Sequence, residues 1–103
     1  EMPHEVWEKA TFKNEIDLHL QNLVDDPASI AKNQILSVQL SHFENFMQRA
    51  IRLDVERVFI IHGVGEGKLR SAIQKRLQEM EAVKSFKNEF HGRYGYGATE
   101  VIF

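Results

Sequence analysis

The sequence contains no cysteine, only two prolines and no apolar run long enough to cross a membrane. Without cysteine, the fold cannot rest on disulfide bonds or thiolate metal sites, and no cysteine nucleophile is available. A membrane helix needs roughly 20 consecutive apolar residues, and residues 1–4 lack the charged and apolar regions of a signal peptide. These absences predict a soluble domain and favour a reducing, cytoplasmic setting.

A chain of 103 residues with 43% hydrophobic residues can enclose one core and no more. Every motif must therefore share a single fold. The sequence begins with Glu rather than Met, and it closes on a strand-like run at residue 103. Both features favour a piece of a larger multidomain protein.

The formal net charge of −2 argues mildly against a dedicated nucleic-acid binder. The charges are unevenly distributed, however. Residues 1–56 hold 5 Lys/Arg and 10 Asp/Glu, whereas residues 57–103 hold 8 Lys/Arg and 5 Asp/Glu. We therefore expect any anionic partner to bind the second half of the chain.

The first 14 residues differ in composition from the rest of the chain. Residues 1–14 are mixed polar, which predicts a loosely ordered arm or linker ahead of a domain over 15–103. Residues 15–20 then alternate strictly between polar and apolar side chains, the period of a half-buried strand. This alternation places Asp17 and His19 on the same face of the strand.

The remaining sequence predicts two helices and three strands. Apolar residues at three-to-four spacing, without Gly or Pro, predict a long helix over 28–53. A continuous apolar run at 58–61 is typical of a central strand covered on both faces, and a second amphipathic helix is expected over 68–80. The last strands, 83–90 and 98–103, are expected to pair as a hairpin. The order βαβαββ predicts an α/β two-layer sandwich, with a mixed four-stranded sheet covered on one face by two helices.

A glycine-rich loop joins the central strand to the second helix. The strand ends at His62, and glycines follow at alternate positions, namely Gly63, Gly65 and Gly67. Such a loop directs backbone N–H groups and a helix N-terminus at one point, where anions bind. Lys68 and Arg70 add positive charge beside it.

The glycine spacing also excludes some ligands and leaves one alternative open. It matches neither a Walker loop nor the dinucleotide fingerprint, so nucleotide cofactors are disfavoured. The alternative is a tight strand-to-helix turn in which the glycines serve only the backbone geometry.

Three polar side chains are expected where the predicted strands end. Asp17 and His19 lie two residues apart on one strand, so a shared ligand can reach both. A carboxylate beside an imidazole can orient a general base or hold a metal with water. In an open α/β sheet the carboxyl ends of parallel strands meet, so His62 is expected to join them. The alternative is an ordinary pair on the solvent face of an edge strand.

The predicted hairpin turn at 91–97 mixes basic and aromatic residues. Arg93 and Tyr96 in this turn are candidates for contacts with unpaired bases, since nucleic-acid bases stack on aromatic rings. Equally, the tyrosines of the turn can serve to cover the hairpin.

Three segments together carry a family resemblance. Residues 16–19 (IDLH), 60–70 (IIHGVGEGKLR) and 95–101 (GYGATEV) resemble the three signatures of the Smr (small MutS-related) domain. They occur in the right order, with a long helix between the first two. The resemblance covers roughly residues 15–103.

The resemblance implies a fold similar to the C-terminal domain of bacterial translation initiation factor three, and it implies nucleic-acid handling. Smr domains include DNA-nicking endonucleases and RNA endonucleases that act at stalled ribosomes. Two functions therefore stay open: an endonuclease that cleaves DNA or RNA phosphodiesters, and a non-catalytic module that binds nucleic acid or the ribosome within a larger protein. The cofactor is unknown, with Mg²⁺ or Mn²⁺ as the candidates.

The resemblance also implies roles for individual residues. It assigns the active site to Asp17, His19 and His62. Nucleic-acid contacts are expected from the loop, the start of the second helix and the hairpin turn, that is from Gly63, Gly65, Gly67, Lys68, Arg70, Arg93 and Tyr96. One departure from the family pattern is Leu20, because Gly usually follows the first histidine. A side chain at this position is expected to narrow the approach to His19, which leaves catalytic competence open.

Overall fold

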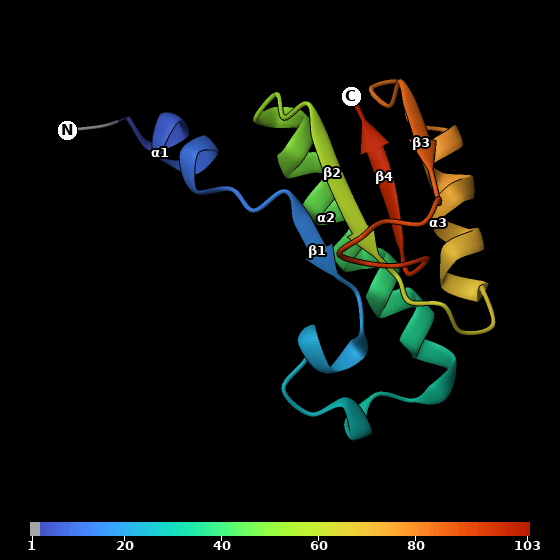
Figure 1. Cartoon of the computed structure of the whole chain (residues 1–103). Helices are drawn as coiled ribbons and strands as arrows, with labels where there is room; N and C mark the ends of the chain where they lie inside the picture. The colour runs from blue at the N-terminus through green and yellow to red at the C-terminus, as the bar shows by residue number, and fades with distance from the viewer. Residues whose placement is uncertain (1–2) are drawn as a thin grey trace.

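The computed structural model describes residues 3–103. Figure 1 shows the arrangement of the helices and strands, with the N-terminal helix projecting from the rest of the chain. The helices are α1 (His4–Thr11), α2 (Ile35–Arg52) and α3 (Lys68–Gln78). The strands are β1 (Glu15–Asp17), β2 (Arg57–Ile61), β3 (Ser85–Lys87) and β4 (Ala98–Ile102).

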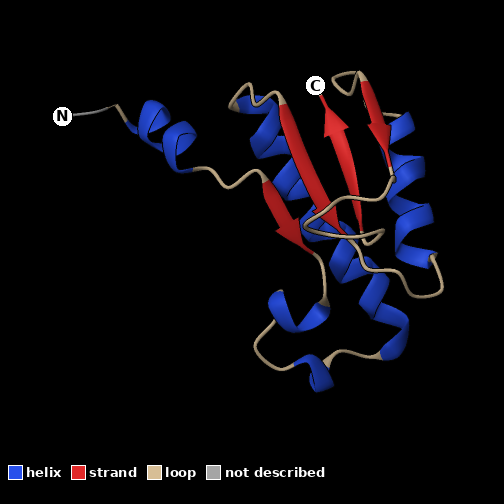
Figure 2. Ribbon diagram, viewed as in Figure 1, coloured by secondary structure: helices blue, strands red, loops and turns tan. Residues whose placement is uncertain are grey.

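The four strands form one mixed sheet in the order β1-β2-β4-β3. β1 runs parallel to β2, and β4 runs antiparallel to both β2 and β3. Helices α2 and α3 lie on one side of this sheet (Figure 2). The predicted two-layer α/β fold and the pairing of the last two strands are therefore confirmed.

The core lies between the two helices and the sheet. It is built from fully or almost fully buried side chains on α2, α3, β2 and β4 and from the residue after β1: Leu18, Phe43, Met47, Val58, Ile60, Ile73, Leu77 and Val101. The helical residues recur at three-to-four spacing and the strand residues alternate, as an amphipathic helix and a half-buried strand require. This packing fixes where β1 and β2 end and thus where the site lies.

The prediction of a loosely ordered arm is wrong for His4–Thr11, which form α1. The Glu8 carboxylate in this helix lies 2.8 Å from the Arg52 guanidinium and 3.5 Å from that of Arg49, both on α2. Phe12, which follows α1, stacks on Phe46 with ring centroids 5.3 Å apart. The composition of residues 1–14 does not reveal these contacts, because the partner residues lie far away in the sequence. Residues 1–2 of the predicted arm lie outside the described residues.

The first strand and the long helix are both shorter than predicted. β1 ends at Asp17, and α2 begins only at Ile35. Short 3₁₀ turns occupy Leu20–Asn22, Pro27–Ser29 and Lys32–Gln34 between them. None of the helices formed by residues 3–103 is long and apolar enough to span a bilayer.

The β3–β4 connection covers the face of the sheet that the helices leave open. The ring of Phe59 on β2 lies 5.1 Å from that of His91 and 5.2 Å from that of Tyr94, measured between centroids. Arg93 pairs with Glu15 on β1 at 3.1 Å. Of the two tyrosines in this turn, Tyr94 thus covers the sheet, whereas Tyr96 is 60% exposed.

Candidate functional site

Asp17 and His19 form a hydrogen-bonded pair at the end of β1. His19 Nδ1 lies 2.5 Å from Asp17 Oδ1, and the same oxygen accepts the His19 backbone N–H at 3.0 Å. Both side chains are accessible, with 46% of His19 and 40% of Asp17 exposed. Because a carboxylate only accepts, His19 Nδ1 carries the proton of this bond, and in the neutral imidazole Nε2 is the nitrogen left with a lone pair.

Leu18 anchors this pair to the fold. Its side chain is fully buried, and its backbone N–H donates to the Ile61 carbonyl at 2.9 Å. Its carbonyl accepts a 2.9 Å bond from Nε2 of Gln39 on α2. No local sequence pattern points to Gln39, because the bond joins residues 21 positions apart. Buried contacts on both sides therefore hold the backbone between Asp17 and His19.

His62, directly after β2, lies in a different environment. Only 8% of the residue is exposed. Its Nδ1 donates to the Gly63 carbonyl at 2.8 Å, and its Nε2 lies 2.9 Å from the Thr99 hydroxyl, which donates to it. Burial lowers the pKa of His62. The hydrogen bond to the Gly63 carbonyl acts to raise it, and the positive charge of Arg70 acts to lower it further. Both ring nitrogens of this neutral imidazole are thus occupied within the protein.

Gly63 follows His62 in the sequence and lies against the side chain of His19. A Cβ atom at this position would lie 3.1 Å from His19 Nε2, so the free nitrogen of His19 faces the glycine loop. Gly63 also has a φ of +82°, which side-chain-bearing residues rarely adopt. The loop is fixed from β4 as well, since the Gly97 carbonyl accepts the backbone N–H groups of His62 and Gly63, each at 2.9 Å.

The rest of the loop leads into the N-terminus of α3. Gly67 caps this helix with a φ of +86°, and the Arg70 guanidinium lies over it, 3.1 Å from where a Cβ would stand. Lys68 is 82% exposed and lies 3.7 Å from the Glu66 carboxylate. At Gly65 nothing approaches within 4 Å of a Cβ position. The α3 amides and two cations therefore border an open stretch of loop, as an anion site requires.

A cavity of about 350 Å³ lies against this loop. It is lined by His62, the loop glycines and the first residues of α3, and by Lys32 and Leu36 from the other side. The sequence did not predict Lys32, because 3₁₀ turns rather than a long helix bring it here. Within residues 3–103, no group of three or more His, Cys, Asp or Glu side chains gathers to hold a metal.

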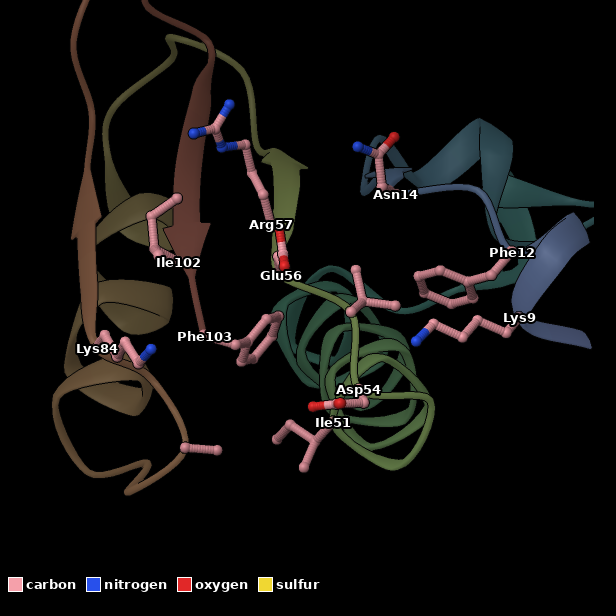
Figure 3. Close-up of a pocket in the computed structure, with 12 residues that line it drawn as sticks. Lys9, Phe12, Asn14, Ile51, Asp54, Glu56, Arg57, Lys84, Ile102 and Phe103 are labelled. Carbon is pink, nitrogen blue, oxygen red and sulfur yellow. The ribbon is translucent and has the colours of Figure 1, made fainter. Parts of the chain in front are cut away.

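A larger cavity of about 1210 Å³ lies at the opposite end of β2 (Figure 3). Side chains from the α1 segment, the turn before β2 and the end of β4 surround it, among them Phe12, Asp54 and Phe103. Its charged residues are of both signs. None of the residues predicted from the motifs lines this cavity. We therefore place the candidate site at the glycine loop, where the motif residues converge.

The two predicted residues of the β3–β4 connection occupy different positions. Arg93 lies against Tyr94, with its guanidinium carbon 5.5 Å from the ring centroid, and it pairs with Glu15. Tyr96 instead contacts Phe90, which is 66% exposed and was not singled out from the sequence. Of the two predicted residues, Tyr96 is thus the one that presents an exposed ring, next to that of Phe90.

Comparison with known proteins identifies the family. The chain matches the Smr domain model over residues 37–103. It is 40% identical over 62 residues to endonuclease MutS2 of Pelotomaculum thermopropionicum. This alignment covers 60% of this chain and 8% of that protein. Endonuclease MutS2 of Staphylococcus aureus is 26% identical over 91 residues, or 88% of this chain and 11% of that protein. The chain thus spans about a tenth of the length of these relatives.

Solved structures extend the similarity of the fold beyond the matched range. The Smr domain of Thermus thermophilus MutS2 superposes with a TM-score of 0.67 at 27% identity, covering 87% of this chain and 96% of that one. YdaL, a stand-alone small MutS-related protein from Escherichia coli, shares the fold with a TM-score of 0.62 at 22% identity, covering 100% of this chain and 77% of that one. The chain therefore belongs to the Smr domain family.

Proposed function

We propose that this Smr domain is an endonuclease that cleaves or nicks nucleic-acid phosphodiesters at the glycine loop, with His19 as its general base. One observation carries the proposal. Asp17 holds Nδ1 of a half-exposed imidazole, and the free Nε2 faces Gly63 at the start of a loop suited to phosphate. The MutS2 relatives, which carry endonuclease in their name, support the same reading.

The chemistry follows from this arrangement. Backbone N–H groups of the loop and the α3 N-terminus, with Lys68 and Arg70, would hold the phosphate oxygens. His19 Nε2 takes the proton of the attacking oxygen as its bond to phosphorus forms and the bond to the leaving oxygen breaks. The leaving oxygen takes a proton from water, and the hydroxide that remains takes the proton from His19 Nε2, which restores the base. Asp17 keeps the imidazole in the required tautomer and stabilises its protonated form, as carboxylate–histidine pairs do in hydrolases.

We assign His62 a positioning role. Its buried ring donates to Gly63 and accepts from Thr99, so it orders the first residue of the loop and offers no nitrogen to a substrate. Leu20 does not enclose the proposed base, because 46% of the His19 side chain remains exposed.

A second function, the non-catalytic binding module, is favoured by the lining of the cavity at the loop, which includes Lys68 and Arg70 but neither Asp17 nor His19. A domain that only bound nucleic acid would keep the loop without needing the free nitrogen of His19.

A cleavage assay separates the two functions. Labelled single-stranded and duplex RNA and DNA would be incubated with the wild type and with the double variant Asp17→Ala/His19→Ala, in EDTA and in Mg²⁺ or Mn²⁺. We expect cleavage of at least one substrate by the wild type and its loss, by about 100-fold or more, in the double variant. His4→Ala, which removes a histidine on α1, is the control and should cleave normally. Binding without cleavage under every condition would establish the binding module instead.

A further inference from the structure

Two large aromatic side chains stand exposed together on the β3–β4 connection. Phe90 is 66% and Tyr96 60% exposed. Their ring centroids lie 5.4 Å apart at an interplanar angle of 65°, an edge-to-face pair. The neighbouring rings of His91 and Tyr94, by contrast, pack on Phe59 of the sheet. Packing on the sheet thus accounts for the positions of the His91 and Tyr94 rings, whereas the Phe90 and Tyr96 rings face solvent.

The backbone that carries these two rings is held in place. Asn88 Nδ2 donates to the Tyr96 carbonyl at 3.0 Å and to the Ala98 carbonyl at 2.7 Å. His91 and Gly95 exchange two backbone hydrogen bonds of 2.9 and 2.7 Å. A ligand would therefore meet a preorganised surface, and little ordering entropy would be lost on binding.

The aromatic pair is continuous with the glycine loop. Tyr96 directly precedes Gly97, whose carbonyl accepts the N–H groups of His62 and Gly63. A Cβ at Gly97 would lie 3.5 Å from Gly63 Cα, so the two backbones are in contact. Gly63 in turn adjoins His19 Nε2 on its other side. Tyr96, which carries one of the exposed rings, therefore lies next in sequence to Gly97, and Gly97 contacts the glycine that faces the proposed base.

We propose that Phe90 and Tyr96 stack on an unpaired base of a single-stranded nucleic acid whose phosphate lies at the glycine loop. The proposal rests on the proposed function and narrows its substrate to single-stranded segments. Aromatic rings beside a phosphate site bind single strands without sequence preference, because every base has a face to stack. Bases within a duplex are already stacked on their neighbours and do not offer that face.

The test measures binding of three labelled probes: an oligothymidylate, the same strand with abasic sites, and a mixed-sequence duplex. Tyr96→Ala and Phe90→Ala should each weaken binding of the oligothymidylate about tenfold and change binding of the abasic strand and the duplex by less than about twofold. Tyr96→Phe keeps the ring and should bind like the wild type. Trp7→Ala removes an exposed aromatic residue on α1, 54% accessible, and is the matched control.

The outcomes separate this inference from the proposed function. Unchanged affinity of both alanine variants for the oligothymidylate, or an equal loss on the abasic strand, would overturn base stacking while leaving cleavage at the loop intact. A wild type that binds none of the three probes would remove the proposed function and the stacking site together.

Discussion

The two motif histidines follow neighbouring parallel strands, yet they lie in opposite environments. His19 is half exposed, and one of its ring nitrogens, Nδ1, is hydrogen-bonded to Asp17. His62 is buried, and Gly63 and Thr99 occupy both of its nitrogens. A histidine can act on a substrate only through a nitrogen that the substrate can reach. This difference is the basis of the proposed division, in which the chemistry takes place at the end of β1 and the residue after β2 orders the loop.

The largest effect is expected from a substitution that disrupts the Asp17–His19 pair at the end of β1. In Asp17→Asn the side chain no longer stabilises a protonated imidazole and can favour the wrong tautomer of His19. Cleavage should fall about 10²- to 10⁴-fold. The unfolding midpoint should change little, because Asp17 is 40% exposed. Cleavage kinetics and thermal unfolding of the same preparation measure the two effects, and a variant that cleaves like the wild type would contradict the assignment.

The second-largest effect is expected from replacing Thr99, the buried hydrogen-bond partner of His62. Thr99 is fully buried, and Thr99→Val keeps its shape while leaving His62 Nε2 without a hydrogen bond. The free energy of unfolding should fall by about 1–3 kcal/mol, as measured by urea denaturation. The same substitution in a His62→Gln background should cost less, because the bond is already altered. An equal cost in both backgrounds would show that the two side chains do not stabilise the fold as a pair.

Two glycines of the loop should respond differently to alanine. Gly63→Ala places a side chain at positive φ and against His19 Nε2, so it should lower the free energy of unfolding by about 1 kcal/mol or more. Gly65→Ala meets open space and should shift the thermal midpoint by less than about 4–8 °C, the equivalent of 1 kcal/mol.

Gly65→Ala should nevertheless weaken binding of an oligonucleotide about tenfold, or 1.4 kcal/mol, because its methyl group would obstruct a phosphate. Fluorescence anisotropy and thermal unfolding together measure both quantities. Normal binding by the folded Gly65→Ala protein would reduce the loop to a structural turn.

The smallest effect is a pH dependence of stability. The pKa of His62 lies below its ordinary value in the folded state, so the unfolded chain binds more protons just below that value. The free energy of unfolding should therefore fall as the pH drops below about 6.5, with a slope of at most about 1.4 kcal/mol per pH unit. Urea denaturation between about pH 7.5 and 5 measures it. His62→Gln should flatten this dependence, and identical profiles for the two proteins would contradict a buried neutral His62.

Local sequence patterns were sufficient for the architecture and for one half of the site. The alternation at 15–20 and the apolar run at 58–61 predicted strands there, and the strands pair from Glu15 with Phe59 to Asp17 with Ile61. Asp17 and His19 were expected on one face, and in the structure their side chains form a hydrogen bond. That contact spans only two residues and needs no distant partner.

The remaining features depend on contacts between residues far apart in the sequence. The burial of His62 depends on Thr99, 37 positions away. The contact of α1 with α2 depends on Glu8 and Arg52, 44 positions apart. A periodic pattern reports which face of an element is apolar, but it does not report which polar side chain fills a given site on the neighbouring element. The different environments of the two histidines were therefore not visible before the fold was known.

Cleavage of one labelled oligonucleotide by folded His19→Ala and His62→Gln tests the division between the two histidines most directly. Rates would be measured in single turnover and corrected for the fraction folded, determined by urea denaturation under the assay conditions. His19→Ala should cleave at least about 100-fold more slowly than the wild type, whereas corrected His62→Gln should stay within about tenfold. A folded His62→Gln protein that loses as much activity as His19→Ala would contradict the account, because it would require His62 to act on the substrate.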